Sequence, residues 1–302
     1  MQKKWEYKSA DAKRIEEVSK KFGVSELLAS VILNRGVEKD EDIEVFLNPT
    51  RNDFHDPSKM PDMKKAVDRI LKAIKNKEKT IIYGDYDVDG ITSITVLKKF
   101  LESCGLETGY YIPNRLEEGY GLNKEAIDSI SKDGYTLIIT VDCGISCIEE
   151  IEYASSLGIE TIITDHHEPM DELPNAIAVV DLKRKDNKYP CNCLAGCGVA
   201  FKLCQAIGTA LEMKPESYLK YLDIVCLGTI SDIVPLIDEN RVIAKLGLKL
   251  IEQTKNPGLK ALLEASRIFY SEFKYYFFWI STKNKCMWKN GIWKRSFRII
   301  FN

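Results

Sequence analysis

The feature that most constrains the fold is an alternation of two kinds of segment between about residues 63 and 181. Short apolar runs rich in β-branched residues, such as "TIIYG", "TLIITVD" and "ETIITD", alternate with stretches that have the apolar spacing of helices. Such runs are typical of parallel strands buried on both faces, because βαβ connections place helices on both sides of the sheet. The sequence therefore predicts an α/β fold with a parallel sheet of about five strands and helices on both faces.

Three of the five apolar runs end on an aspartate, namely Asp142, Asp165 and Asp181, and a fourth run leads directly into Asp85. The carboxyl ends of parallel strands meet at one edge of a sheet, where open α/β sheets bind their ligands. An aspartate at such an end can also simply cap the following helix, and for Asp142 or Asp181 alone both interpretations stand. Several acids with two histidines at the same edge favour a ligand-binding site.

The stretch "DYDVDG" places three carboxylates, Asp85, Asp87 and Asp89, at alternate positions and ends with Gly90. These six residues fit the first half of an EF-hand calcium loop, but Val96 occupies the position that needs a bidentate glutamate. A β-branched run also precedes the stretch where an EF-hand requires a helix. Clustered carboxylates repel one another and need a divalent cation, so the pattern predicts a metal site of another kind. A solvated acidic turn is the alternative.

The segment "TDHHEP" adds a second group of candidate ligands after another predicted strand. Asp165, His166 and His167 lie here and include two of the three histidines in the chain. A mixed set of carboxylate and imidazole ligands suits manganese, with magnesium or iron as alternatives. The segment "CNCLAGCGVAFKLC" lacks the paired C-x2-C spacing of structural zinc sites, so we expect ordinary buried or loop thiols there.

Length and composition limit the class of protein. The chain has 302 residues and a formal net charge of −2, which predicts about two domains and argues neither for nor against a polyanionic partner. The charged N-terminal stretch lacks the apolar core of a secretory signal, and no run of about 18 apolar residues predicts a membrane span. Nine cysteines, an odd number, without a signal indicate reduced thiols, so we expect a cytoplasmic protein with no membrane partner.

Four motifs occur in order along the chain and together resemble those of the DHH phosphoesterase superfamily: "YGDYDVDG", "VDCGIS", "TDHHEP" and "GTISDIVPL". Within this superfamily, the chain resembles the RecJ-type single-stranded-DNA exonucleases from about residue 20 to about residue 266. The narrower resemblance rests on "FLNPTRNDFHDPSKMPDMKKAVDRI", "YIPNRLEEGYGLN" and "AGCGVAFKL", which other branches lack. Pyrophosphatases and small cyclic-dinucleotide phosphodiesterases of the superfamily carry a histidine four residues before the first ligand aspartate, where this chain has Tyr83.

The resemblance implies a Rossmann-like DHH phosphoesterase domain whose site holds two manganese ions, with magnesium as a possible substitute. Asp87 and Asp89 would each hold one ion, and Asp142 would bridge the two. His166 and Asp232 would complete the shell of the second ion. These five residues are therefore the expected catalytic and metal-binding set.

Other polar residues of the same motifs have supporting roles in this interpretation. Asp85 and His167 would be secondary metal ligands or would orient the primary ones, and Asp165 would be a hydrogen-bond partner of the ligands rather than a ligand itself. Arg115, which follows the second predicted strand, would hold the terminal phosphate of a DNA 5′ end by charge-assisted hydrogen bonds. A surface salt bridge is the alternative role for Arg115.

The resemblance implies metal-dependent 5′→3′ exonuclease activity on single-stranded DNA in recombination and repair. Two cations about 3.5–4 Å apart would activate a water and neutralise charge on the phosphodiester. Expected partners are single-stranded DNA, helicases and single-strand-binding protein. One rival is a phosphodiesterase acting on short oligonucleotides or cyclic dinucleotides, which Tyr83 disfavours. The other is an inactive metal-binding remnant, which the intact ligand set disfavours.

The predicted organisation has four parts: a helical lead-in at 1–62, the DHH catalytic domain at 63–235, a linking helical segment at 236–266 and an aromatic, basic tail at 267–302. RecJ-like proteins continue into a second domain with an N-A-x-G-R motif. The tail is either a nucleic-acid-binding segment or the product of a frameshift. Codons 285–293, read from their second base, force Cys-Gly and permit the longer string Asn-Ala-Cys-Gly-Arg-Met-Gly. We therefore favour the frameshift and expect the second domain to be missing.

Overall fold

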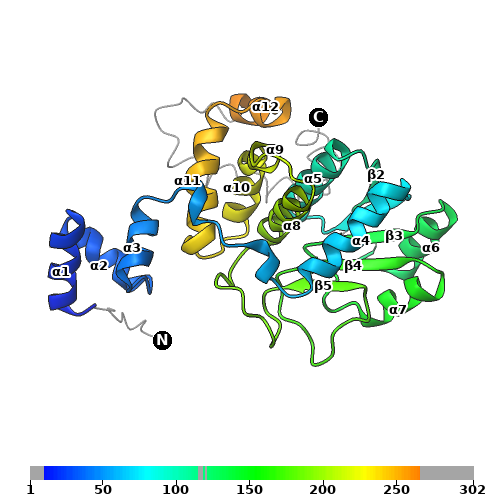
Figure 1. Ribbon diagram of the computed structural model, residues 1–302, viewed down its shortest axis with the longest axis horizontal. Helices are drawn as coiled ribbons and strands as arrows, with labels where there is room; N and C mark the ends of the chain where they lie inside the picture. Colours follow the sequence, from blue (N-terminus) through cyan, green and yellow to red (C-terminus); the bar gives the residue numbers. More distant parts are fainter. Residues whose placement is uncertain (1–9, 115–117, 120, 266–302) are drawn as a thin grey trace, which may run out of the picture.

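The computed structural model describes residues 10–114, 118–119 and 121–265, and the predicted tail at 267–302 lies outside them. The centre of the fold is a fully parallel sheet with strand order β2-β1-β3-β4-β5 (Figure 1). The strands are β1 Thr80–Gly84, β2 Thr108–Tyr111, β3 Leu137–Val141, β4 Glu160–Asp165 and β5 Ala178–Asp181. The predicted α/β class and the predicted five strands are confirmed.

The strand order places a switch in chain direction between β1 and β3. From β1 the chain moves outward to β2, and it then returns to form β3 on the other side of β1, with Tyr83 paired to Tyr111 of β2 and to Thr140 of β3. In open α/β sheets, ligands bind outside the carboxyl ends of the strands at such a switch point. The loops that follow β1 and β3 therefore meet at one place.

Helices cover both faces of the sheet (Figure 1). One face packs against α4, α5 and α8, and the other packs against α6 and α7. In that order, these helices span Met63–Asn76, Val88–Ser103, Gly196–Ala210, Lys124–Lys132 and Ile148–Ser156. Alternate side chains of β1 enter the two cores, since Ile82 belongs to the first and Ile81 and Tyr83 belong to the second. Burial on both faces explains why the strand sequence is apolar throughout.

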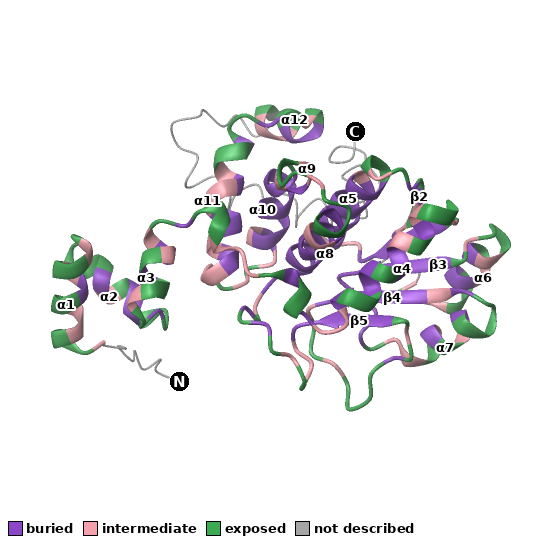
Figure 2. Ribbon diagram, in the orientation of Figure 1, coloured by how far each residue is buried: buried purple, intermediate pink, exposed green. Residues whose placement is uncertain are grey.

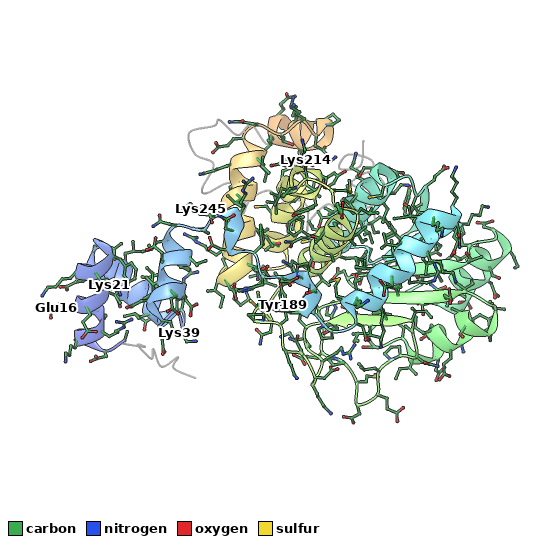
Figure 3. All side chains as sticks on the ribbon, in the orientation of Figure 1. Glu16, Lys21, Lys39, Tyr189, Lys214 and Lys245 are labelled. Carbon is green, nitrogen blue, oxygen red and sulfur yellow. The ribbon has the colours of Figure 1, made fainter. Side chains whose placement is uncertain are left out.

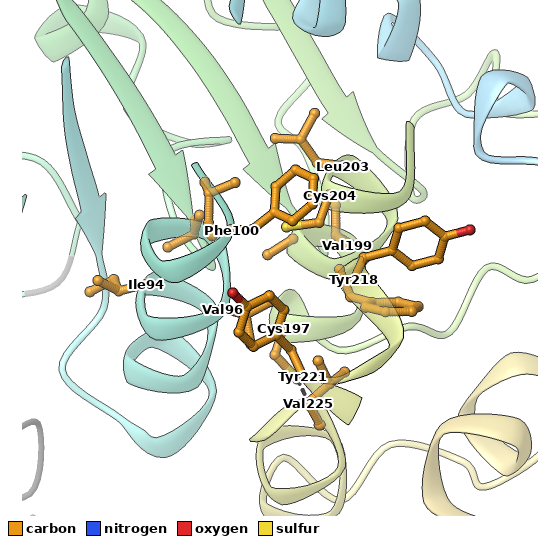
Figure 4. Close-up of a cluster of buried hydrophobic side chains, with 14 of the residues drawn as sticks. Ile94, Val96, Phe100, Cys197, Val199, Leu203, Cys204, Tyr218, Tyr221 and Val225 are labelled. Carbon is orange, nitrogen blue, oxygen red and sulfur yellow. Dashed lines mark hydrogen bonds between the residues drawn. The ribbon is translucent and has the colours of Figure 1, made fainter. Parts of the chain in front are cut away.

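The larger core continues from the sheet into a helical layer that includes α9 (Glu216–Leu219) and α10 (Leu222–Ser231). Phe100 of α5, Leu203 of α8 and Val225 of α10 pack in this layer (Figure 4). Figure 2 shows α5, α8 and α10 as mostly buried helices. This second layer holds the start of α8 and the end of α10 close to the strand ends.

A separate small core lies in the N-terminal part of the described chain. Helices α1, α2 and α3 bury Val18, Ile32 and Ile43 against one another, and they stand apart from the sheet in Figure 1. They span Ala12–Phe22, Glu26–Asn34 and Asp40–Leu47. Two 3-10 turns, η1 at Arg51–Asp53 and η2 at Pro57–Lys59, then lead to α4.

Helix α11 (Asp238–Ile251) joins this N-terminal group to the core, and α12 (Pro257–Ala265) follows it. Lys245, labelled in Figure 3, donates from Nζ to the carbonyl of Leu47 at 2.9 Å. Helix α11 packs on both α3 and α10. The predicted division of the chain into 1–62, 63–235 and 236–266 stays a prediction. Within the described ranges, no helix is long and apolar enough to cross a membrane.

Candidate metal centre

Acidic and imidazole side chains from four segments converge at the carboxyl edge of the sheet. The loop from β1 into α5, the loop after β3, the end of β4 and the end of α10 each contribute. In each of three overlapping groups, the possible ligand atoms lie within 4.8 Å of one another. The groups are Asp85–Asp87–Asp142, Asp89–His166–Asp232 and Asp142–His166–His167. Seven of the predicted site residues are thus brought together.

Hydrogen bonds from two helix starts fix Asp87 and Asp89. Asp87 is the N-cap of α5, and its Oδ1 accepts a hydrogen bond from the Gly90 amide at 3.0 Å. Asp89 is almost fully buried and accepts from the amides of Gly196 at 2.6 Å and Cys197 at 2.8 Å, at the start of α8. Unsatisfied amides and the positive end of the dipole make a helix start a favourable place for a carboxylate. Both acids are therefore oriented before any cation binds.

Asp142 occupies the centre of the cluster in an uncommon backbone conformation. Its φ is 58°, a left-handed value that aspartate adopts more readily than most residues. Its amide donates to the Thr164 carbonyl at 3.1 Å, and its Oδ1 lies 3.1 Å from His166 Nε2. A Cβ on Gly196 would come within 2.6 Å of Asp142 Oδ1, so only glycine leaves room for this carboxylate.

The helix-cap alternative is wrong for both Asp142 and Asp181. Helix α7, the next after β3, has Cys147 as its N-cap, so Asp142 does not cap it. Helix α8, the next after β5, has Ala195 as its N-cap, so Asp181 does not cap it. Asp181 accepts from the Lys183 amide at 2.6 Å, and it belongs to none of the three groups in the described structure. Burial raises the pKa of Asp181 to about 7.

Asp165 is fully buried and holds the two histidines in place. Its Oδ1 accepts from the amides of His166 at 2.7 Å and His167 at 3.2 Å and lies 2.7 Å from His167 Nδ1, while its Oδ2 accepts from the Ile145 amide at 3.0 Å. Burial acts to raise the pKa of Asp165, but the hydrogen bond and charge of His167 outweigh it and hold that pKa below its ordinary value. The same hydrogen bond raises the pKa of His167 to about 8.

The remaining acids repel one another inside the protein. Burial raises the pKa of Asp142 well above its ordinary value, and the charges of Asp89 and Asp87 add to the shift. Burial, followed by repulsion from Asp89, also raises the pKa of Asp87. Carboxylate oxygens with imidazole nitrogens form a donor set that fits divalent cations such as Mn²⁺. A cation at the cluster would favour the ionised form of these acids.

The remaining sequence expectations concern Arg115, the cysteines and Tyr83. Arg115 lies outside the described residues. All eight cysteines in the described part of the chain are free thiols, and none of them belongs to the three groups. Tyr83 is fully buried in the second core, and its hydroxyl donates to the Gly121 carbonyl at 3.0 Å.

The sequence reasoning missed the contribution of α8. The amides of Gly196 and Cys197 bind Asp89, and the bare Cα of Gly196 makes room for Asp142. The available signal was the pair of glycines in "AGCG" at the start of a predicted helix, a position where glycine otherwise weakens the helix.

A family model described as "DHH family, N-terminal domain" matches residues 79–229, which contain most of these acids and both histidines. The chain belongs to the DHH family. It is 44% identical over 263 residues to the single-stranded-DNA-specific exonuclease RecJ of Bacillus subtilis (strain 168). That match covers 87% of this chain and 33% of the relative, so the chain spans about a third of the relative's length. The predicted resemblance to RecJ-type exonucleases is confirmed.

Solved structures agree with this DHH assignment. A crystal structure of exonuclease RecJ bound to manganese has a TM-score of 0.73 at 30% identity, over 80% of this chain and 61% of that one. A structure of RecJ from Thermus thermophilus in complex with Mn²⁺ has a TM-score of 0.81 at 27% identity, over 97% of this chain and 42% of that one. The DHH fold therefore extends across the described core.

Proposed function

We propose that this chain carries the catalytic core of a metal-dependent exonuclease that hydrolyses the phosphodiester bonds of single-stranded DNA from the 5′ end. The observation that supports it most is the convergence of Asp85, Asp87, Asp89, Asp142, His166, His167 and Asp232 into adjoining groups at a strand switch point. The similarity to proteins named single-stranded-DNA-specific exonucleases supplies the substrate class. Within the described residues, we see no arrangement of a nucleophilic serine or cysteine with a base that would suggest another chemistry.

The three groups suggest how the ligands are divided. Asp87 and Asp85 would hold one divalent ion, Asp89, His166 and Asp232 would hold a second, and Asp142 lies between the two groups and would bridge them. Mn²⁺ fits these donors, and Mg²⁺ is the alternative. Divalent ions in such a pair stabilise the charge that develops on a phosphodiester during in-line displacement.

The chain's own residues would orient this chemistry. Asp165 would fix the orientation of the His167 imidazole through its contact with Nδ1. Because the pKa of His167 is raised to about 8, its ring would carry positive charge at neutral pH in the metal-free protein, where it would attract a phosphate. The amides of Gly196 and Cys197 would hold the carboxylate of Asp89 in one orientation during the reaction.

The test uses the purified chain, Mn²⁺ and single-stranded DNA labelled at its 5′ end. We expect the native chain to release labelled mononucleotide and an Asp142→Ala variant to release none. A matched control is Asp171→Ala, because Asp171 is a fully exposed acid in the segment after β4 and outside the three groups. This variant should cleave as the native chain does.

Other outcomes separate the rival functions. Cleavage of dinucleotides without cleavage of long strands would favour a phosphodiesterase for short oligonucleotides. Tight Mn²⁺ binding without any cleavage would contradict activity of this chain alone. It would indicate that the parts present only in the longer relatives are needed to position the substrate. Failure to bind Mn²⁺ would contradict the proposal as a whole.

The broader biological setting belongs to the same proposal. We expect helicases and single-strand-binding protein to supply and cover the DNA strands on which this activity would act in recombination and repair. The cytoplasmic location that the sequence suggests stays a prediction.

A further inference from the structure

The residue after Asp232 has a backbone conformation that its side chain disfavours. Helix α10 ends with Asp232 as its C-cap, and Ile233, whose amide donates to the Ile230 carbonyl at 3.3 Å, has a φ of 64°. Helices that end in a left-handed residue usually carry glycine there. Among the six described non-glycine residues with positive φ, Ile233 alone is β-branched, the class for which this conformation is a true outlier.

Packing within the described chain does not compensate for this strain. The side chain of Ile233 is 71% exposed, whereas the next residue, Val234, is half-buried and packs against the larger core. A glycine at this position would remove the steric conflict and would expose less apolar surface. The fold of the described residues therefore does not explain why isoleucine occupies this position.

Hydrogen bonds from the buried side chain of Asn240 hold the loop after α10 in this conformation. Asn240 is fully buried, and its Nδ2 donates to the Pro235 carbonyl at 3.0 Å and to the Cys193 carbonyl at 2.6 Å. These bonds tie the loop after α10 to the segment that leads into α8. Strain that the surroundings impose in this way is typical of functional sites.

The position of Ile233 points to the substrate. Asp232 Oδ2 lies 3.9 Å from His166 Nδ1, in the group that also contains Asp89. Adjacent Cα atoms are about 3.8 Å apart, so Ile233 lies next to this group. A phosphate held there by a divalent ion would bring its attached sugar and base near Ile233. An exposed apolar side chain gains most by covering the uncharged part of such a ligand.

We propose that Ile233 contacts the sugar and base of the nucleotide whose phosphate lies at the Asp89–His166–Asp232 group. This inference rests on the proposed function, since it takes a nucleotide as the ligand of that group. Ile233 then sets the preference of the site for a nucleotide over a bare phosphate, while its backbone strain is retained for that contact.

The test measures the binding of two probes, thymidine 5′-monophosphate and inorganic phosphate, by calorimetry in the presence of Mn²⁺. The native chain should bind the nucleotide more tightly than phosphate. Ile233→Ala keeps a Cβ and shortens the side chain, so it should weaken nucleotide binding about tenfold and leave phosphate binding unchanged. Ile233→Gly should show the same loss of affinity together with a higher melting temperature, because the left-handed strain is relieved.

Glu212→Gly is the matched control for backbone strain. Glu212 follows α8 with a φ of 53°, is exposed, and lies at the far end of a helix of 15 residues whose first residue is at the site. It should raise the melting temperature without changing the affinity for either probe. If Ile233→Ala leaves the nucleotide preference intact while phosphate still binds, the contact is disproved, and a protein segment becomes the better partner for Ile233. If the native chain binds no phosphate with Mn²⁺, the proposed function fails along with it.

Discussion

Gly196 and Asp142 are so close that a methyl group added at position 196 would collide with the carboxylate of Asp142. The Cβ of an alanine at 196 would lie 2.6 Å from Asp142 Oδ1 and 2.7 Å from Asp142 Cβ. We expect Gly196→Ala to displace this carboxylate and weaken Mn²⁺ binding about 10- to 100-fold, as the loss of other supporting contacts does. Calorimetric titration with Mn²⁺ measures the effect.

Gly198→Ala is the control for that substitution. It adds a Cβ to the same helix turn, 3.2 Å from Leu194 Cβ, where a small shift of one side chain suffices. Its Mn²⁺ affinity should remain within a few-fold of the native value, with an unchanged circular dichroism spectrum for both variants. Native affinity in Gly196→Ala would show that Asp142 can move without loss.

Asp165 should control the protonation of His167. With Asp165→Asn, the charge that favours the imidazolium is lost, and we expect the pKa of His167 to fall from about 8 toward about 6.5. Nuclear magnetic resonance titration of the ring in metal-free protein gives this value directly. A pKa that stays near 8 would assign the shift to other acids of the cluster.

The same pair has a defined effect on stability. The pKa of His167 is higher in the folded chain than in the unfolded one, so the folded state binds this proton more tightly. The stabilisation is complete below about pH 6.5 and is lost as the pH rises through about 8. Asp165→Asn should remove this part of the pH dependence in urea unfolding of the metal-free protein.

At the scale of secondary-structure elements, one buried ion pair joins four segments. Lys202 Nζ of α8 lies 2.9 Å from Glu239 Oε1 of α11, and both side chains have no exposed surface. Lys202 also donates to the His55 carbonyl, and Glu239 accepts from the hydroxyl of Tyr189, which is labelled in Figure 3. The connector before α4, the segment before α8 and the two helices therefore share one polar network.

Breaking this network on one side should be costly. Lys202→Met leaves Glu239 buried without its counter-ion, and we expect a loss of about 3–5 kcal/mol in the free energy of unfolding. The double variant Lys202→Met, Glu239→Gln should recover part of the loss, because no unpaired charge remains. Urea unfolding of the native chain and of the single and double variants measures both effects, and additive losses would contradict coupling of the pair.

The sequence predicts elements well where burial is uniform and poorly where it depends on distant partners. The sequence predicts strand β1 because a five-residue apolar run bounded by turn residues is typical of a strand buried on both faces. The buried pair of Lys202 and Glu239 was not predicted, because charged residues usually lie at the surface and these two are 37 positions apart. In the same way, strand ends predict Asp85 and Asp142, and alternate spacing predicts Asp87 and Asp89, whereas Asp232 follows only from the family resemblance. The role of Gly196 depends on a contact with Asp142, 54 positions away.

For the whole molecule, the effect of Mn²⁺ on stability should depend on pH. The raised pKa values of Asp142 and Asp87, caused first by burial and then by mutual repulsion, mean that the folded metal-free chain binds more protons than the unfolded chain. Its stability therefore falls as the pH rises through the folded-state pKa of these acids. A bound cation replaces the protons, so the gain in melting temperature from Mn²⁺ should be larger at about pH 8 than at about pH 5.

Melting curves with Mn²⁺ and with a chelator, recorded across this range, check the expectation. Asp142→Asn serves as a control, because it removes one buried charge and should make the metal-free protein less sensitive to pH. An Mn²⁺ effect that is equal at both pH values would contradict raised pKa values for Asp142 and Asp87 in the folded metal-free chain.

The proposed ligands are spread along the chain, so they leave the ribosome at different times. The first acids emerge with β1, but Asp232 lies at the end of α10, after α8 has been made. At about 5–20 residues per second, a ribosome needs several seconds or more to travel from Asp85 to Asp232. During that interval the proposed ligand set is incomplete, so we expect the group that contains Asp232 to bind a cation only after α10 has been made.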